Sequence, residues 1–368
     1  MLRRFALASI TVAIGFAAPL LLAELVLQFL PVGTGLHVQT VDAEQPVAKF
    51  EPNRDFVYSR GWNLRGVNRG HVNNDGFVND QDYSVTDTRP LFAIVGDSFV
   101  EAAMVPFANT MQGRLGAELG EASRVYSFGG SGAPLSQYIV WAAYAAQKYH
   151  PAGIAIVVVG NDFDESLLKY KNVPAHHYFA EGPDGKLELR RVDYHPSWAR
   201  ALLSRSALAR YVIHDLQSTV LLLRVEGWLS DGYEVRFVAN TSNSVEPVRV
   251  ADSLRVIPAF LDELLRRTAM PPDRLMLVVD GVRPELYAGE TVGSDSYFGI
   301  MRAELMAAAR RLGIEVIDMQ TVFAAAYRKD GRHFEFPDDA HWDSHGHEVA
   351  ASAIRGSALF HKLLLFDH

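Results

Sequence analysis

The stretch FAIVGDSFVEA, residues 92–102, carries four apolar residues directly into Gly96-Asp97-Ser98 and then resumes with a helix-like pattern. A continuously apolar run that stops at a glycine is typical of a buried strand in a parallel sheet. Such a strand would place Ser98 at the carboxyl edge of the sheet, where open α/β folds keep their ligand crevices. Ser98 is therefore a candidate nucleophile, and the alternative is that it only caps the following helix.

Similar apolar runs recur along the chain and alternate with helical patterns. The sequence predicts strands at residues 91–95, 124–128, 154–159, 274–279 and 314–318. It predicts helices at residues 109–119, 135–149, 250–268, 296–311 and 344–364. Such alternation is typical of a parallel sheet covered by helices on both faces. We therefore expect an α/β fold, a three-layer α/β/α sandwich around a parallel five-stranded sheet.

Two regions interrupt the alternation. Residues 32–90 show no sustained period, which predicts a lead-in of turns and short strands. Residues 163–249 predict a cap inserted into a domain that spans residues 91–368. Within the cap, HHYFAEGPDGKLELRR (176–191) predicts a hairpin, and residues 197–225 predict one or two amphipathic helices. These helices carry arginines that suit lipid headgroups or an anionic substrate, or simply a solvated face, namely Arg200, Arg205, Arg210 and Arg224.

The N-terminus predicts a membrane anchor within residues 1–31. Phe5 to Ala23 is an uncharged apolar run of 19 residues, close to the roughly 20 residues that span a bilayer. A cleaved signal peptide, the alternative, would have a shorter apolar region. Arg3 and Arg4 precede the run and the next basic residue is Lys49. The positive-inside rule therefore places the N-terminus in the cytoplasm and the rest of the chain outside the cytoplasmic membrane, in the periplasm.

Glu24 follows this apolar run directly, and apolar residues continue after it. A charged residue at this depth indicates either a partner within the membrane or a side chain that reaches the outer interface.

Composition excludes several kinds of site and partner. The chain has 35 Lys and Arg against 43 Asp and Glu, a formal net charge of −8, and no cluster of basic residues. Nucleic acid is therefore not an expected partner. The absence of cysteine excludes disulfides, thiolate metal sites and a cysteine nucleophile.

Other candidate residues stand at or after the ends of other predicted strands. FGGSGAPLSQY (128–138) contains Gly132, whose loop can present a backbone N–H. VVVGNDFDE (157–165) places Asn161 at the sheet edge. FPDDAHWDSHGH (336–347) offers Asp338 or Asp339 beside His341.

Acyl transfer needs a hydroxyl nucleophile, an imidazole that accepts its proton and a carboxylate that orients the imidazole. Ser98, His341 and an adjacent aspartate supply these groups. The N–H of Ser98, an N–H near Gly132 and the Asn161 amide suit an oxyanion hole. Each motif alone is also typical of a capped turn, a loop or a structural Asp-His pair, but together they indicate a serine acyl-ester site.

On these motifs the chain resembles the SGNH hydrolase superfamily, or GDSL esterases, over about residues 91–168 and 274–360. The signature residues match Ser98, Gly132, Asn161 and His341, with Phe99 where many members have leucine. The resemblance does not cover the cap. It implies a flavodoxin-like SGNH fold, catalytic Ser98 and His341, and an oxyanion hole of Ser98, Gly132 and Asn161.

The resemblance leaves two choices for the triad aspartate. Many members use the aspartate three residues before the histidine, here Asp338, whereas members with Asp-x-His-Trp use the one two residues before. Because Trp342 follows the histidine, we expect Asp339.

The resemblance implies an esterase or deacetylase acting on an O-acylated, carbohydrate substrate or a small ester. The alternative is an O-acetyltransferase that acylates a polysaccharide through the same acyl-serine, as in membrane-anchored bacterial members that work with a polytopic membrane-bound O-acyltransferase. A further alternative is a non-catalytic subunit of a membrane complex that retains the fold.

A histidine-rich run near the C-terminus suggests a metal site as an alternative. His341, His345 and His347 with Asp343 contain the residue types that bind zinc. His345 and His347 more simply begin the last helix, and the site has a complete mechanism without metal. We expect neither a metal nor a cofactor.

Overall fold

The computed structural model describes residues 2–216, 237–238, 241–242, 246–289, 296–337 and 339–364, without the side chains of residues 2–14, 237–238, 241–242 and 364. The chain divides into two compact units. Unit 1 comprises Met1–His37, Asp55–Gly70 and Pro196–Tyr233. Unit 2 comprises Val38–Arg54, His71–His195 and Glu234–His368.

Five parallel strands form the central sheet of unit 2, in the order β11-β10-β5-β3-β4. The strands are β3 (Leu91–Gly96), β4 (Arg124–Gly129), β5 (Gly153–Val158), β10 (Leu275–Val279) and β11 (Glu315–Asp318). Every residue of β3, β4, β5 and β10 is buried, which explains their continuously apolar sequences. The predicted α/β fold with a five-stranded parallel sheet is confirmed.

The strand order reverses beside β3. The chain runs from β3 to β4 on one side and then returns to the other side of β3 for β5, β10 and β11. In open α/β sheets, ligands bind at the carboxyl ends of the strands where the order reverses. Ser98 follows β3 and Asn161 follows β5, so both residues stand at this switch point.

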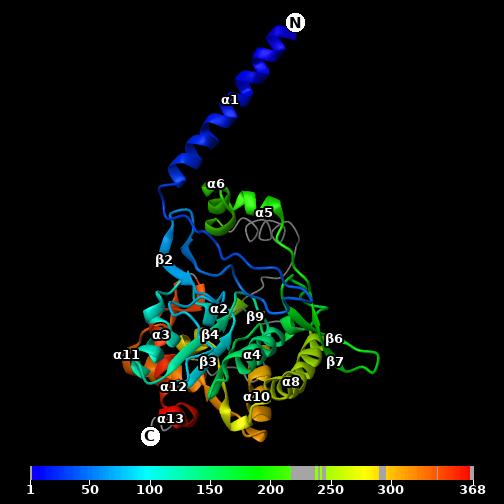
Figure 1. Ribbon diagram of the computed structural model, residues 1–368, viewed down its shortest axis with the longest axis vertical. Helices are drawn as coiled ribbons and strands as arrows, with labels where there is room; N and C mark the ends of the chain where they lie inside the picture. The colour runs from blue at the N-terminus through cyan, green and yellow to red at the C-terminus, as the bar shows by residue number, and fades with distance from the viewer. Residues whose placement is uncertain are drawn as a thin grey trace. The chain divides into compact units, whose positions relative to one another are not determined.

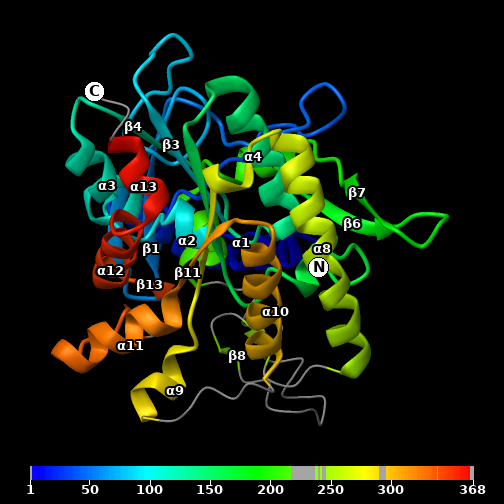
Figure 2. The same ribbon diagram turned by 90° about the horizontal axis from the view of Figure 1, so that it is seen from below.

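Helices cover both faces of the sheet (Figures 1 and 2). Ile154 and Ile156 of β5 belong to one apolar cluster, whereas Ala155 and Val157 belong to another. Alternate residues of a strand point to opposite faces, so the two clusters are the two interfaces of a three-layer sandwich. Helices of the first cluster are α4 (Leu135–Tyr149), α8 (Pro247–Thr268) and α10 (Tyr297–Arg311). Helices of the second are α3 (Met111–Leu119), α11 (Met319–Asp330), α12 (Ser344–Arg355) and α13 (Ala358–Leu364).

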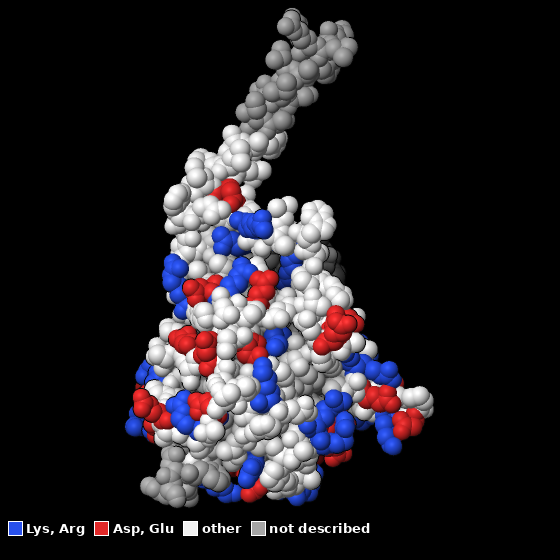
Figure 3. Space-filling view, in the orientation of Figure 1, with Lys and Arg blue, Asp and Glu red and all other residues white. Residues whose placement is uncertain are grey.

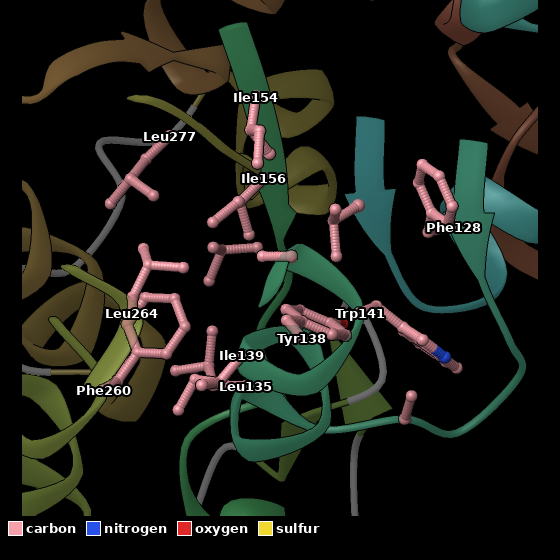
Figure 4. Packing of buried hydrophobic residues seen from close by; sticks show 14 of the residues in the cluster. Phe128, Leu135, Tyr138, Ile139, Trp141, Ile154, Ile156, Phe260, Leu264 and Leu277 are labelled. Carbon is pink, nitrogen blue, oxygen red and sulfur yellow. The ribbon is translucent and has the colours of Figure 1, made fainter. Parts of the chain in front are cut away.

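The first cluster shows how the chain fills one interface. Figure 4 shows Ile156 of β5 together with Ile139 of α4 and Phe260 of α8, all of them buried. Close packing of such side chains from strand and helix supplies most of the favourable free energy of folding.

The helix predicted over residues 344–364 is wrong as a single element. Gly356 ends α12, and the Ser357 hydroxyl oxygen accepts a hydrogen bond from the Phe360 N–H at 3.1 Å. A serine that satisfies a free N–H at a helix start favours a new helix, so α13 begins at Ala358. Helix α11 was not predicted. It begins after Asp318, whose carboxylate accepts from the Gln320 N–H at 3.0 Å, and ends before Gly331.

Short elements complete unit 2. The predicted hairpin within residues 176–191 is confirmed, since β6 (His177–Glu181) pairs antiparallel with β7 (Leu187–Arg191). Two further strand pairs are β12 (Glu335–Phe336) with β13 (Asp339–Trp342), and β8 (Phe237–Val238) with β9 (Thr241–Ser242). The short helices are α2 (Ser98–Glu101), η1 (Phe107–Asn109), η2 (Asp164–Ser166), η4 (Pro272–Arg274) and α9 (Arg283–Ala288).

Unit 1 contains α1 (Leu2–Leu27) and most of a two-stranded sheet, β1 (Arg54–Arg60) and β2 (Arg65–Val72). Part of the region predicted to be helical at 197–225 is described, and residues 217–225 lie outside the described part. Its helices are α5 (Trp198–Leu203), α6 (Ala207–Arg210) and the π-helical turn η3 (Tyr211–Asp215).

In the described residues, no helix combines the length and the hydropathy needed to cross a membrane. The predicted anchor, Phe5 to Ala23, lies within α1, and the side chains of its residues 5–14 are not described. Glu24 of α1 has its partners in its own chain. Its carboxylate accepts hydrogen bonds from the Ser206 hydroxyl and from the N–H groups of Ala207 and Leu208, at 2.7, 2.9 and 2.8 Å.

Candidate active site

Ser98 is the first residue of α2, and Asp97 is its cap. The Asp97 carboxylate accepts a hydrogen bond from the Phe99 N–H at 2.9 Å, so the alternative role of Ser98 as the helix cap is taken by its neighbour. A side chain at position 96 would bring its Cβ within 2.5 Å of Val100. Glycine is therefore required for the tight turn that carries the chain from β3 into α2.

The structure brings Ser98, His341 and Asp339 into one line of hydrogen bonds. The Ser98 Oγ lies 2.7 Å from the His341 Nε2. The His341 Nδ1 is hydrogen-bonded to the Asp339 Oδ1, which also accepts from the His341 backbone N–H at 3.1 Å. With Nδ1 protonated toward Asp339, Nε2 is free to accept the serine proton. Asp338, the other candidate, lies outside the described residues.

The environment of His341 favours its protonated form. Burial lowers the pKa of this imidazole, but the hydrogen bond to Asp339 and the nearby charges of Asp339, Asp97 and Glu101 raise it by more. Its pKa is therefore above the usual value for histidine. A base with a raised pKa accepts a proton more readily, although a smaller share is neutral at pH 7.

The strand that carries His341 is held by a buried ion pair that sequence reasoning missed. The Arg283 guanidinium donates to both oxygens of Asp280 at 2.6 and 2.7 Å, and to the carbonyl of Ala340 at 2.6 Å. The Trp342 Nε1 donates to the same Asp280 at 3.1 Å. Both residues that flank His341 are therefore fixed. The available signal was the position of Asp280, directly after β10, because Ser98 and Asn161 also follow strands.

Gly132 lies in the loop after β4, which a second missed residue holds. The Ser131 N–H and hydroxyl donate to the two oxygens of Glu101 at 2.7 and 2.8 Å. Gly132 has a φ of 73°, in the left-handed region that favours glycine. Within the described part of the chain, the N–H groups of Ser98 and Gly132 donate no hydrogen bond. They are therefore available to an oxyanion.

Asn161 lies in the loop after β5, linked to Gly132 through an ion pair. Its Nδ2 donates to the Glu165 carboxylate at 2.9 Å, and Glu165 pairs with Lys171. The Lys171 ammonium in turn donates to the Gly132 carbonyl at 2.8 Å. One amide hydrogen of Asn161 is thus used internally and the other is left for a ligand. No hydrogen bond joins Gly132 or Asn161 to Ser98 or His341 among the described residues.

Asp97 and Glu101, which flank Ser98 along the chain, carry buried carboxyl groups. Burial raises the pKa of Asp97 to about 6 and that of Glu101 to about 7. The Asp97 Oδ2 lies 3.3 Å from the Ser98 Oγ. The serine hydroxyl therefore has a second acceptor whenever His341 is protonated and cannot accept.

The residues of the histidine-rich run each contact different groups of the protein. His347 is buried, and its Nδ1 accepts from the Met111 N–H at 3.3 Å. Burial lowers its pKa to about 3. Asp343 caps α12, whereas the ring nitrogens of His345 lie 3.5 Å from the Asp330 carboxylate and 3.3 Å from that of Glu348. Within the described residues, no three His, Asp or Glu side chains are grouped as metal ligands would be.

No protein-family profile matches the sequence, and no curated protein matches it either. Solved structures do show similarity. A member of the lipolytic G-D-S-L family from Veillonella parvula shares 12% identity at a TM-score of 0.36, over 72% of this chain and 94% of that one. A lipase from a goat rumen metagenome shares 13% identity at a TM-score of 0.40, over 73% of this chain and 98% of that one. An acetyl xylan esterase shares 10% identity at a TM-score of 0.41, over 73% of this chain and 99% of that one. With TM-scores below 0.5, these likenesses carry no argument about the reaction.

Proposed function

We propose that this protein is a serine acyl-ester hydrolase of the SGNH type, with Ser98 as its nucleophile. The observation that carries the proposal is the hydrogen-bonded line from Asp339 through His341 to Ser98, with 2.7 Å between the His341 Nε2 and the Ser98 Oγ. This line stands at the switch point of a parallel sheet, where ligands bind in such folds. Nucleophile, base and orienting carboxylate are thus arranged as acyl transfer requires.

In the first half of the reaction, the Ser98 oxygen attacks the acyl carbonyl while its proton passes to the His341 Nε2. Asp339 holds the ring and stabilises the imidazolium. His341 then returns the proton to the leaving alcohol, and an acyl-serine remains. In the second half, water attacks the acyl carbon and gives a proton to His341. His341 then passes this proton to the Ser98 Oγ as the bond between that oxygen and the acyl carbon breaks, which releases the carboxylic acid and restores the serine hydroxyl.

The negative charge that develops on the carbonyl oxygen needs donors that are already in place. We assign this role to the N–H groups of Ser98 and Gly132 and to the amide of Asn161. The unused N–H groups and the left-handed backbone of Gly132 support the assignment. A single fixed donor of this kind contributes about 3 to 4 kcal/mol to the lowering of the barrier.

We further propose that the substrate is an O-acylated carbohydrate outside the cytoplasmic membrane, in the periplasm, and that α1 anchors the chain in that membrane. The apolar run Phe5 to Ala23 after Arg3 and Arg4 supports the anchor. Within α1, Phe16 and Leu21 are largely exposed, as lipid-facing side chains would be. We also propose a polytopic membrane-bound acyltransferase as a partner, which the anchor and the resemblance support. Glu24 adds no support for a partner within the membrane, because its carboxylate is hydrogen-bonded within its own chain.

The full chain in mild detergent tests the proposal. It should release acetate from p-nitrophenyl acetate and from acetylated xylan, and Ser98→Ala should lose about 10³-fold or more of this activity. Ser352→Ala, which changes an exposed serine of α12, is the matched control and should keep it.

Acetylated product on an added unmodified glycan, formed faster than free acetate, would instead identify an O-acetyltransferase. If the wild type neither hydrolyses nor transfers, the alternative of a non-catalytic subunit is favoured. If Ser98→Ala is as active as an active wild type, Ser98 is not the nucleophile and the proposed mechanism is wrong.

A further inference from the structure

The segment PSWARALLSRSALARYVIH, residues 196–214, combines exposed apolar side chains with basic ones and has no acidic residue. On α5, Trp198 is 80% exposed, Leu202 60% and Leu203 50%. Val212 and Ile213 of the π-helical turn are also exposed. A short helix normally buries its apolar face against the protein. Here the apolar side chains point away from it, beside Arg205, which is exposed too.

The start of α6 is fixed to the end of the apolar part of α1. The Glu24 carboxylate, directly after the predicted span, accepts from the Ser206 hydroxyl and from the N–H groups of Ala207 and Leu208. In Figure 1, α6 lies beside the end of α1 within unit 1. Wherever Glu24 stands relative to a membrane, the first turn of α6 therefore stands at the same level.

The other end of the segment is fixed as well. Asp215 is buried, and its carboxylate accepts from the Gly33 N–H at 3.1 Å and from the Ser59 hydroxyl. Gly33 lies just beyond α1, so both ends of residues 206–215 are held close to the end of that helix. The first acidic residue after the segment is thereby turned inward, and the exposed charges over α5 and α6 are positive. Figure 3 shows both blue and red side chains in this part of unit 1, so the positive charge is a property of residues 196–214 themselves.

From these contacts we infer that α5, α6 and the π-helical turn form a second membrane contact, in which Trp198, Leu202, Leu203, Val212 and Ile213 enter the lipid interface while Arg205 binds anionic headgroups. This inference rests on the proposed anchor. Tryptophan is enriched at membrane interfaces. Basic amphipathic segments lie in the headgroup region and prefer anionic lipids. A bilayer suits the surface better than a protein partner does, because the surface begins where the apolar run of α1 ends.

The full chain allows a direct test because it has no cysteine. Single cysteines replace Leu203 on the inferred surface, Phe16 in α1 and Leu312 in unit 2, all exposed side chains. Each variant carries an environment-sensitive fluorophore and is placed in nanodiscs of phosphatidylcholine with phosphatidylglycerol, with or without nitroxide-labelled lipid. We expect lipid quenching at Leu203→Cys and at Phe16→Cys, and none at Leu312→Cys.

Two outcomes distinguish a failure of the second membrane contact from a failure of the proposed anchor. Quenching at Phe16→Cys but not at Leu203→Cys overturns the second contact and leaves the anchor intact. Quenching at neither position overturns the anchor, and the second contact with it.

A charge reversal tests the role of the arginine. Arg205→Glu should reduce quenching at Leu203→Cys in anionic nanodiscs, more strongly at low salt than at high salt. Arg328→Glu makes the same charge change at an exposed residue of α11 and should leave the signal unchanged. An equal loss from both variants, or none from Arg205→Glu, contradicts binding of headgroups at this surface.

Discussion

Replacing Glu101 by glutamine should stabilise the protein at alkaline pH relative to the wild type, and progressively less as the pH falls. Glu101 is buried, and burial raises the pKa of its carboxyl group from 4.5 to about 7. Glutamine has nearly the same shape and keeps both contacts to Ser131, because its carbonyl can accept from the N–H and its amide can donate to the hydroxyl. The substitution therefore keeps the packing and removes the titration of Glu101, together with the small charge effect that Glu101 has on His341.

The size of the effect follows from the two pKa values. A carboxyl group with a raised pKa in the folded state retains its proton where the unfolded chain has released it. Its contribution to stability is therefore greatest below the unfolded pKa and is lost as the pH rises through about 7. A difference of about 2.5 pKa units corresponds to about 3.4 kcal/mol, of which about 2.5 kcal/mol falls between about pH 5 and about pH 8.5.

Urea unfolding of the full chain in mild detergent measures this difference. Near-UV circular dichroism reports on the packed aromatic side chains of unit 2, such as Trp141 and Trp342, both of them buried. The free energy of unfolding of Glu101→Gln minus that of the wild type should increase by about 2.5 kcal/mol between about pH 5 and about pH 8.5. Glu304→Gln, on the exposed side of α10, should show no such trend.

The reasoning is refuted if the difference between Glu101→Gln and the wild type is the same at both pH values. Glu101 would then be ionised in the folded protein throughout this range, and burial would not control its proton.

Four further predictions concern the triad and the parts that hold it. Because the pKa of His341 is raised, kcat/KM should fall as the pH drops through a value above the usual 6.5 or so; a midpoint below that value contradicts this. Asp339→Asn should lower kcat by about 10³ to 10⁴-fold and move this acid limb to lower pH, and an unmoved limb would show that Asp339 does not set the pKa. Arg283→Met leaves the buried Asp280 unpaired and should lower the free energy of unfolding in urea by about 3 to 5 kcal/mol; a loss under about 1 kcal/mol speaks against a buried charge pair. Gly132→Ala puts a Cβ on left-handed backbone and should lower kcat at least about ten-fold with little change in KM, whereas a rise in KM alone would place Gly132 in substrate binding.

Much of the sheet could be predicted because four of its five strands are buried on both faces. Residues 91–96 and 275–279 have no polar residue that would blur the apolar pattern. The same physical cause identified the candidate site, since glycine and polar residues at strand ends interrupt these runs abruptly. Ser98 and Asn161 stand out in the sequence for this reason.

The parts that were not predicted depend on contacts between distant residues. In the sequence, nothing distinguishes Glu101 from an ordinary helix residue. Its role follows from its hydrogen bonds with Ser131, which lies 30 residues further along the chain. The role of Arg283 likewise depends on its hydrogen bond to the carbonyl of Ala340, far along the chain. Helix α11 had local signals, Asp318 before it and Gly331 after it, but its alanine-rich middle has a weak apolar periodicity. The break between α12 and α13 depends on Gly356, on the Ser357 hydroxyl and on a distant residue. The Glu315 carboxylate accepts from the first N–H groups of α13, those of Ala358 and Leu359, at 2.9 and 2.8 Å.

The central claim is that Ser98 is a hydroxyl activated by His341, and labelling by a fluorophosphonate probe tests it most directly. The full chain is treated with the probe, digested and analysed by mass spectrometry, beside His341→Ala and the exposed control His361→Ala. We expect the wild type and His361→Ala to carry the label on Ser98 and His341→Ala to carry none. A label on another residue, or equal labelling of Ser98 without His341, would contradict the account.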